Sequence, residues 1–279
     1  MPKIKVKDFN LEYTLFCGQV FRVSQAEDWY YIITRDRIFK IRQFSDYLEF
    51  HGIDKEFLVH YLALDEPYSD ILGEINKDPC IDAAIRRYHG LRIIRQDPWE
   101  CFISFLCSSA ANIPKIQLNL ELLSKIFGKR ICLNEYEGYA FPNPGGLNNY
   151  ENILMAKTGF RAKFILSANR LVSEEFLLSL RKLPYSEAKK ALKNVPGIGD
   201  KIADCILLFS LGFTGAFPVD TWMKKILQKL YFGNRVVSNR LLSDFGIGYF
   251  GKYAGYAQQF LYLFARESGL DKVSFPIER

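Results

Sequence analysis

Hydrophobic and polar residues follow two different rhythms along the chain, and the rhythm changes near His51. Before it, aromatic and β-branched residues recur at every second position in short runs separated by Gly, Ser and Asp: FNLEYTL, GQVFRVSQ, DWYYIITRDRIFKIRQF and DYLEFHG. Alternation with a period of two is typical of strands that bury one face. We therefore expect an antiparallel sheet of about five strands in residues 1–50.

Beyond His51 the apolar positions recur at helical spacing. This spacing runs through DKEFLVHYLAL, YSDILGEI, DPCIDAAIRRYHGL, DPWECFISFLCSSAANIPKIQLNLELLSKIFG, NILMAKTGFRAKFILSANRLVS, SEAKKALKNV, GDKIADCILLFSLG, DTWMKKILQKLYF and GYAQQFLYLFARE. Asp or Ser stands before several of these segments, as helix N-caps require. The stretch NEYEGYAFPNPGGLNNY, residues 134–150, has Pro and Gly but no period, so we expect a loop there.

These patterns predict an α+β protein in two parts. Residues 1–90 would form an N-terminal antiparallel β-sheet domain with short helices, and residues 91–279 an all-helical region. Within the helical region we expect a helical hairpin at 185–212, followed by a Gly- and Pro-containing loop at 212–220. A chain of 279 residues is long enough to bury a full core of this kind.

Composition narrows the class of protein without deciding it. With 49% hydrophobic and 24% charged residues the chain is typical of globular proteins, and its formal charge of +6 permits a polyanionic partner. The opening MPKIKVKDFN lacks the apolar run of a signal peptide, and no apolar stretch is long enough to span a membrane. The 6 cysteines lack metal-ligand spacing. We expect an intracellular, cytoplasmic protein with free thiols.

The stretch LKNVPGIGDKIADCILLF, residues 192–209, predicts two helices joined by a tight turn. Pro196 would end the first helix, and Gly197 and Gly199 would permit conformations closed to other residues. Amide groups exposed at the start of the second helix suit a phosphate. Such turns are also common without any ligand, and nearby lysines are what favour DNA backbone binding: Lys182, Lys189, Lys190 and Lys193. Carbonyl groups on the other side of the turn could hold a monovalent cation, namely those of Lys193, Val195 and Ile198.

Two charged residues after this turn are candidates for chemistry. Lys201 heads an apolar helix; in an apolar cleft its amine would favour the neutral form, which can attack carbon. The side chain could equally extend to solvent, and the pattern leaves both readings open. Asp220 precedes TWMKKILQKL at an N-cap position, where backbone N–H groups would keep its carboxylate ionised and oriented. That role can be purely structural, or it can place a negative charge against a developing cation.

Together, the glycine hairpin, the lysine, the apolar helix and the Gly…Pro-Val-Asp turn resemble the helix–hairpin–helix (HhH-GPD) glycosylase superfamily. Within it the chain resembles the prokaryotic type of 8-oxoguanine DNA glycosylase/AP lyase over nearly its whole length. The matching segments occur in the same order: CGQVFR (17–22), DPWECFISFLCSS (97–109), GFRAKFI (159–165), VPGIGDKIADC (195–205) and YAGYAQQFLY (253–262). The resemblance implies an N-terminal sheet followed by a helical catalytic region.

The resemblance also implies a base-excision mechanism. Members of this family flip the damaged base out of duplex DNA into a pocket. Lys201 matches the nucleophile that attacks the sugar C1′, expels 8-oxoguanine and leaves a Schiff base competent for β-elimination. Asp220 matches the carboxylate that stabilises the cationic sugar and orients the lysine. No cofactor is required, and an iron–sulfur cluster is not expected, because no cysteine follows Cys205. We expect a monomer that binds duplex DNA containing 8-oxoguanine.

Five residues are implied in recognition of the flipped base. Gly18 matches the residue whose carbonyl accepts the N7–H of 8-oxoguanine, and Gln258 the one that reads the Watson–Crick edge. Cys205 and Tyr262 match the two sides of the stack around the base, and Pro218 belongs to the same pocket. Read without the family, Gly18 is a turn glycine, Cys205 a core thiol and Tyr262 one more aromatic residue.

A second group of residues is implied in contact with the rest of the DNA. Phe160 matches a wedge aromatic, and Arg161 an arginine that faces the orphaned cytosine. Gly197 and Gly199 match the turn that holds the backbone. Asn112 belongs to the segment that, in the family, fills the gap left by the flipped base.

That segment departs from the family pattern of three asparagines followed three positions later by an arginine, because here it reads SSAANIPK. Ala110 stands where an asparagine would fill the gap, and Lys115 where an arginine would read the opposite cytosine. Since lysine lacks the planar fork needed for bidentate base contact, we expect a relaxed preference for the opposite base. Trp222 stands where many eukaryotic members have histidine.

Two other functions stay open. One is a glycosylase of the same fold that removes another damaged purine; Gly18, Cys205 and Gln258 favour the oxidised purine instead. The other is a lesion-binding module without catalysis, which the missing asparagine at position 110 makes conceivable. Lys201 and Asp220 argue against it, because binding alone needs neither.

Overall fold

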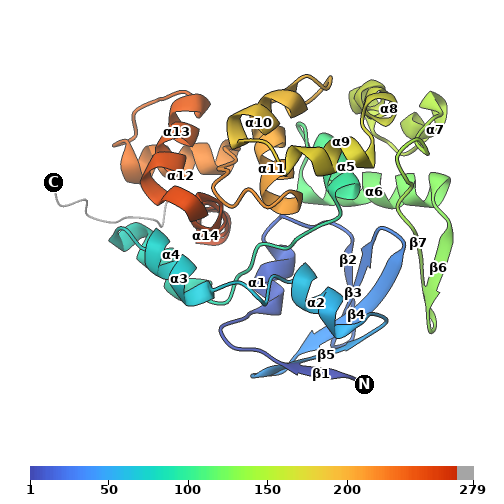
Figure 1. Ribbon diagram of the computed structural model, residues 1–279, viewed down its shortest axis with the longest axis horizontal. Coiled ribbons are helices and arrows are strands. Elements are labelled where there is room, and N and C mark those ends of the chain that lie inside the picture. Colours follow the sequence, from blue (N-terminus) through green and yellow to red (C-terminus); the bar gives the residue numbers. More distant parts are fainter. Residues whose placement is uncertain (269–279) are drawn as a thin grey trace.

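The structure is a computed structural model that describes residues 1–268 (Figure 1). Its N-terminal part contains a five-stranded sheet in the order β1-β5-β4-β3-β2, and all neighbouring strands are antiparallel. The strands are β1 (Lys3–Lys5), β2 (Val23–Ala26), β3 (Trp29–Thr34), β4 (Arg37–Gln43) and β5 (Tyr47–His51). The period-two pattern of the first fifty residues therefore predicted the sheet correctly.

One segment of this region was wrongly assigned to a strand. FNLEYTL contains a short helix, α1 (Leu11–Phe16), whose N-cap Asn10 accepts a hydrogen bond from the Tyr13 N–H. Leu11 and Leu15, four residues apart, are both buried. Residues four positions apart share one face of a helix, and they also share one face of a strand. The spacing therefore fits a helix as well as a strand.

Helices make up most of the chain beyond the sheet (Figure 1). The helices are α2 (Lys55–Tyr61), α3 (Tyr68–Ile75), α4 (Pro79–Arg87), α5 (Pro98–Cys107), α6 (Ile113–Phe127), α7 (Tyr150–Met155), η1 (Gly159–Arg161), α8 (Ala162–Leu171), α9 (Glu174–Leu180), α10 (Tyr185–Lys193), α11 (Asp200–Ser210), α12 (Thr221–Tyr231), α13 (Asn239–Phe250), η2 (Gly251–Tyr253) and α14 (Ala254–Ser268). Helices α9 and α13 were not predicted, and the long helical pattern after residue 97 is two helices, α5 and α6, separated by a turn.

The expected loop at 134–150 is wrong in its first part. Strands β6 (Arg130–Leu133) and β7 (Tyr136–Tyr139) pair as a hairpin whose turn places Asn134 in the left-handed region, at φ 52°. The Tyr136 ring stacks on Tyr31 of the N-terminal sheet with the ring centroids 4.1 Å apart. This hairpin therefore lies against the N-terminal sheet although it belongs to the second half of the chain, and a domain boundary at residue 90 stays a prediction.

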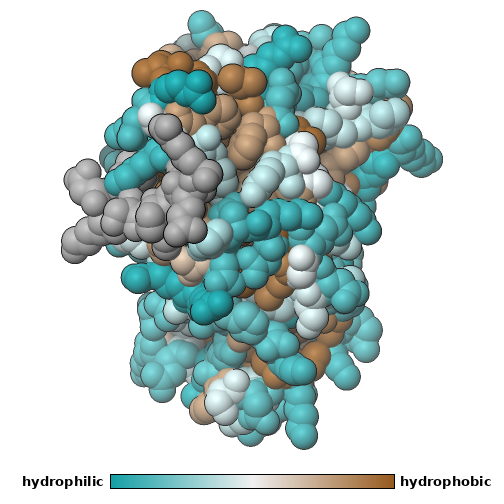
Figure 2. Space-filling model, turned by 90° about the vertical axis from the view of Figure 1, so that its left-hand side faces the viewer, coloured by the Kyte–Doolittle hydropathy of each residue, from teal (hydrophilic) through white to brown (hydrophobic). Residues whose placement is uncertain are grey.

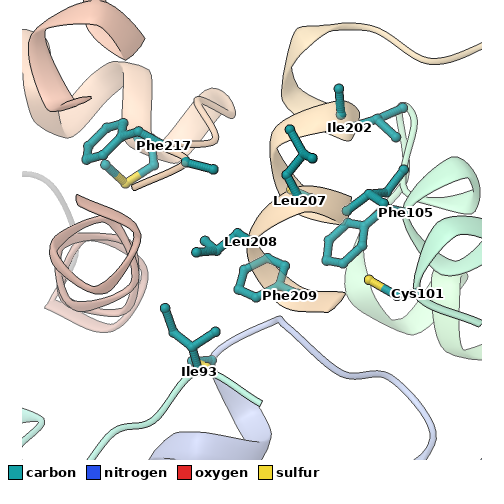
Figure 3. Close-up of a cluster of buried hydrophobic side chains, with 14 of the residues drawn as sticks. Ile93, Cys101, Phe105, Ile202, Leu207, Leu208, Phe209 and Phe217 are labelled. Carbon is teal, nitrogen blue, oxygen red and sulfur yellow. The ribbon is translucent and has the colours of Figure 1, made fainter. Parts of the chain in front are cut away.

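Part of the hydrophobic core surrounds α11, the helix that carries Lys201. All nine residues from Ile202 to Ser210 are buried, so this helix is covered on every side. Phe209 of α11 stacks on Phe105 of α5 with the ring centroids 5.3 Å apart, and Figure 3 shows this packing. A fully buried helix is held in one position by its surroundings, and this fixes the residue at its exposed end, Lys201.

The surface is mixed. Figure 2 shows hydrophilic side chains over most of one face, with apolar ones among them. Trp222 and Leu241 are partly exposed apolar residues of α12 and α13. Among residues 1–268, no helix is both long and apolar enough to cross a membrane.

Candidate active site

One cleft gathers most of the residues that the sequence singled out. It has a volume of about 1610 Å³ and is lined by the turn between α5 and α6, the start of α11, the loop before α12, and α14. A cleft of this size exceeds that of a typical small-molecule site, so it has room for a nucleobase together with flanking sugar and phosphate.

The Lys201 amine lies in this cleft. Gly199 is the N-cap of α11, which places Lys201 in the first turn, directly before the buried part of the helix. Its Nζ donates a hydrogen bond to Ser108 Oγ at 2.9 Å and lies 5.3 Å from the centre of the Phe105 ring. The side chain therefore turns inward across the cleft and does not extend to bulk solvent.

Asp220 is the N-cap of α12, as predicted, with Oδ1 accepting the Met223 N–H at 2.8 Å. Burial raises the pKa of its carboxyl above the ordinary value, while the capping N–H groups and the positive charge of Lys201 lower it. Desolvation is the largest of these effects, so the capping N–H groups and Lys201 offset it only in part.

The amine and the carboxylate face the same cleft without touching. No ion pair joins Lys201 to Asp220 among the contacts of the described residues, although each is close enough to influence the other electrostatically. Both groups line the cleft, and their roles in catalysis stay a prediction.

The loop that carries Asp220 is held by close contacts at two helical glycines. Gly255 of α14 donates its N–H to Thr214 O at 2.8 Å, and a Cβ on Gly255 would lie 2.8 Å from that oxygen and 3.0 Å from Ala216 O. A Cβ on Gly246 of α13 would lie 2.6 Å from the Phe217 ring. The loop therefore packs against helix backbone, which fixes its position more firmly than contact with mobile side chains would.

The five candidate base-recognition residues come together. Gly18, Cys205, Pro218, Gln258 and Tyr262, far apart in the sequence, all line the cleft. Gly18 has φ +82°, and a Cβ there would lie 3.2 Å from Tyr262, so glycine allows the ring to approach. Burial raises the pKa of the Cys205 thiol to about 12, which keeps the sulfur neutral and apolar. These side chains form a pocket next to the amine.

The turn between α5 and α6 is built differently from what its sequence suggested. Arg161 is buried and donates to the carbonyls of Ser109, at 2.7 Å, Ala110, at 3.0 Å, and Thr158, at 3.1 Å. Ala110 adopts φ +49°, the left-handed region that alanine disfavours and asparagine tolerates. Arg161 thus stabilises the turn through hydrogen bonds to its carbonyl groups, and its contact with a base stays a prediction.

The other candidate DNA contacts lie around this turn. Ala110 and Asn112 line the cleft, and the Asn112 side chain caps α6 by accepting the Lys115 N–H at 3.0 Å. Lys115 and Phe160 are not among the cleft residues, and Phe160 is 55% exposed on η1. Their contact with DNA stays a prediction.

In the hairpin turn, only one of the two glycines is required by backbone conformation. Gly197 has φ +90°, and a Cβ there would lie 2.7 Å from the Phe164 ring. Gly199 has an ordinary φ of −97°, so our expectation for it was wrong. A Cβ on Gly199 would meet nothing within 4 Å, so the outer side of the turn is open. The Val195 carbonyl accepts the Ile198 N–H at 3.1 Å, and a cation at this turn stays a prediction.

The lysines near the hairpin do not act as one basic patch. Lys189 Nζ lies 2.8 Å from the buried Asp204, which also accepts the Tyr185 hydroxyl at 2.6 Å. Lys193 Nζ lies 2.8 Å from Asp200 in the first turn of α11. Lys189 therefore ties α10 to α11, and contact between the nearby lysines and DNA stays a prediction.

Sequence reasoning missed three residues of the site: Ser108, Phe105 and Gln259. Ser108 and Phe105 contact Lys201 from 93 and 96 positions away in the chain, and both lie within the quoted segment DPWECFISFLCSS. Gln259 follows Gln258 directly and also lines the cleft. The available signal was their position inside two of the matched segments, DPWECFISFLCSS and YAGYAQQFLY.

The cysteines are all free, as expected, and within residues 1–268 no group of three or more His, Cys, Asp or Glu side chains could hold a metal ion.

A helical hairpin that leads into a buried helix, with an amine at its start and a capped carboxylate across a cleft, defines a protein of the helix–hairpin–helix glycosylase class. Residues 2–102 match the family model of the 8-oxoguanine DNA glycosylase N-terminal domain. The solved structure of MBOgg1 in complex with a low-affinity DNA ligand is 34% identical, with a TM-score of 0.91 over 96% of both chains.

A second structure, the Clostridium acetobutylicum 8-oxoguanine glycosylase/lyase in complex with DNA containing cytosine opposite 8-oxoguanine, is 30% identical, with a TM-score of 0.89 over 96% of this chain and 98% of that one. The Arabidopsis thaliana N-glycosylase/DNA lyase OGG1 is 34% identical over 80% of this chain, and the match spans 65% of that protein's length. The chain belongs to the 8-oxoguanine DNA glycosylase family.

Proposed function

We propose that this protein removes 8-oxoguanine from duplex DNA and then cleaves the strand at the resulting site, acting as a DNA N-glycosylase and AP lyase. The observation that carries the proposal is the placement of the Lys201 amine and the Asp220 carboxylate on one cleft that also holds the base pocket. The family and the solved relatives support it.

In the first step the damaged nucleotide leaves the stack and enters the cleft. Lys201 Nζ forms a bond to C1′ as the C1′–N9 bond breaks, and the base departs with that electron pair and takes up a proton. Asp220 stabilises the positive charge that develops on the sugar. Ser108 holds the amine within reach of C1′ through its hydrogen bond.

The second step uses the same amine. After nitrogen loses a proton, the C1′–O4′ bond breaks, and O4′ leaves with that electron pair and takes up a proton. The product is a Schiff base, an iminium at C1′ linked to Lys201. Removal of a proton from C2′ then drives cleavage of the C3′–O bond, and the phosphate leaves with that electron pair. This chemistry requires no cofactor and no iron–sulfur cluster, because the protonated imine itself is the electron sink.

Base recognition would depend on a few directed contacts. The Gly18 carbonyl accepts the N7–H that 8-oxoguanine has and guanine lacks, and loss of such a buried contact is worth about 1–3 kcal/mol. The neutral Cys205 sulfur and the Tyr262 ring enclose the base, beside Pro218, and Gln258 reads its Watson–Crick edge.

Contact with the rest of the DNA would use the outer surface of the site. The open side of the turn at Gly197 and Gly199 takes a backbone phosphate, and Phe160 wedges the stack. Ala110 fills the gap of the flipped base poorly, and Lys115 reads the opposite base weakly, so preference for cytosine is relaxed. We further propose that the protein works as a monomer near the nucleoid in the cytoplasm, with a monovalent cation at the hairpin turn as an optional structural element.

The test is release of free base from 8-oxoguanine duplex, measured separately from strand cleavage. Wild type should do both, Lys201→Gln neither, and Asp220→Asn should retain binding with a slower release of base. Release of an alkylated purine and not of 8-oxoguanine would favour a different substrate. Tight lesion binding without release by wild type would favour a non-catalytic module.

A further inference from the structure

Two consecutive glutamines of α14 reach the cleft. Gln258 and Gln259 are 4% and 3% exposed, and both line the cleft beside the base pocket. The Gln259 Nε2 donates a hydrogen bond to Gln258 Oε1 at 2.8 Å. The oxygen of the Gln258 amide therefore already accepts a hydrogen bond from Gln259.

This arrangement is unfavourable for stability. Gln259 Oε1 is buried and has no hydrogen-bond partner among the described residues. An unpaired buried carbonyl oxygen lowers stability, because it loses its hydrogen bonds to water and gains none, and native proteins retain few of them. An apolar side chain of similar size would avoid the cost, so the presence of glutamine at position 259 calls for a reason other than stability.

The reason lies in what the bond does to Gln258. A free glutamine amide can rotate by half a turn and exchange its donor and acceptor. It then fits both a 6-keto purine, which offers an acceptor at O6 and a donor at N1, and a 6-amino purine, which offers the reverse. Donation from Gln259 holds Gln258 Oε1 on the side of its neighbour, and this leaves the Gln258 NH₂ group for the base.

We propose that Gln259 is a positioning residue that fixes the orientation of the Gln258 amide and so makes the pocket select 6-keto over 6-amino purines. An NH₂ group in that position donates to the O6 of 8-oxoguanine but opposes the exocyclic amine of 8-oxoadenine. The inference rests on the proposed function, since it assumes that the flipped base enters this pocket.

The experiment compares single-turnover release of 8-oxoguanine and 8-oxoadenine from the same duplex opposite the same base. In Gln259→Met the donor is lost and the volume is nearly kept, so the amide of Gln258 can rotate. We expect the ratio of the two rates to fall at least tenfold. Thermal unfolding of this variant should show equal or higher stability, because the unpaired oxygen is gone.

Two controls separate positioning from general damage. Ser124→Ala removes another buried, unpartnered oxygen, in α6 and away from the cleft, and should leave the ratio unchanged. In a Gln258→Met background, Gln259→Met should change the ratio no further, because Gln259 acts through Gln258. Gln259→Leu serves as a second variant if Gln259→Met folds poorly.

The outcomes are distinct. A wild type that releases 8-oxoguanine, combined with a ratio within twofold of wild type in Gln259→Met, would overturn the inference. An equal fall of the ratio with and without Gln258 would also overturn it, since Gln259 would then contact the base itself. A wild type that releases neither base would overturn the proposed function and, with it, the premise of this inference.

Discussion

We expect the position of Asp220 to depend on Gly255, a glycine of α14 that does not line the cleft. In Gly255→Ala the new Cβ would lie 2.8 Å from Thr214 O and 3.0 Å from Ala216 O, and closer still to Leu208. Leu208 can rearrange, but the two oxygens belong to the backbone of the loop that ends at Asp220. Since ordinary contact begins near 3.4 Å, the loop must retreat by roughly half an ångström.

Two effects follow from this displacement. Overpacking of a tight interface costs about 1–3 kcal/mol, which for a chain of this size lowers the unfolding midpoint by roughly 3–10 °C. A shift of about 1 Å in a catalytic group costs about a hundredfold in rate, so half that distance should slow base release by about tenfold. Single-turnover release of 8-oxoguanine and differential scanning calorimetry measure the two effects.

The matched control is Gly248→Ala. Gly248 lies in α13, is exposed, and a Cβ there would meet nothing within 4 Å. Replacing a helical glycine that has free space stabilises by about 0.5–1 kcal/mol, with no effect on catalysis. If Gly255→Ala released base as fast as Gly248→Ala, the position of the Asp220 loop would not depend on this contact.

Three further predictions concern pH, opposite base and strain. Burial raises the pKa of Asp204 to about 6, so its proton is bound more tightly in the folded state, and stability falls as pH rises from about 4 to about 6, by at most about 3 kcal/mol. Urea unfolding at pH 4.5 and pH 7 should show this loss in wild type relative to Asp204→Asn; a constant difference would contradict it. Rates of 8-oxoguanine release opposite C, A, G and T should lie within about tenfold of one another in wild type. Lys115→Arg should increase the preference for cytosine, because arginine adds bidentate contact worth about 1–3 kcal/mol. A strong wild-type preference for cytosine would contradict this. Ala110→Gly should stabilise the protein by about 0.5 kcal/mol in urea unfolding. Glycine adopts a φ of +49° without the steric strain of alanine, and this gain outweighs the greater entropy of glycine in the unfolded chain. A loss of stability would count against strain at this turn.

Periodicity predicted those parts of the fold whose hydrophobic pattern is long or strictly alternating. It identified the N-terminal sheet and the hairpin helices α10 and α11. It failed for α1, where a single pair, Leu11 and Leu15, is too short to distinguish a helix from a strand. It also failed for the β6–β7 hairpin, whose strands of four residues lie beside glycine and proline and depend on tertiary contact with Tyr31.

The candidate site, too, could be predicted from the sequence only in part. The resemblance brought Lys201 and Asp220 forward, and the N-cap role of Asp220 followed from its position before a helix. The direction of the Lys201 side chain could not be predicted, because its acceptor, Ser108, lies 93 positions earlier in the chain. Nor could the placement of Arg161 beneath the turn at Ala110 be read from the sequence, since it depends on the path of the backbone between two helices.

In the proposed mechanism the Lys201 amine forms the covalent intermediate with DNA, and this step can be trapped. Borohydride reduction during reaction with 8-oxoguanine duplex converts the Schiff base to a stable amine link. We expect a cross-linked product with wild type that peptide mass spectrometry maps to Lys201, and no product with Lys201→Gln. A cross-link that persists in Lys201→Gln, or the absence of any cross-link while wild type releases 8-oxoguanine, would contradict it.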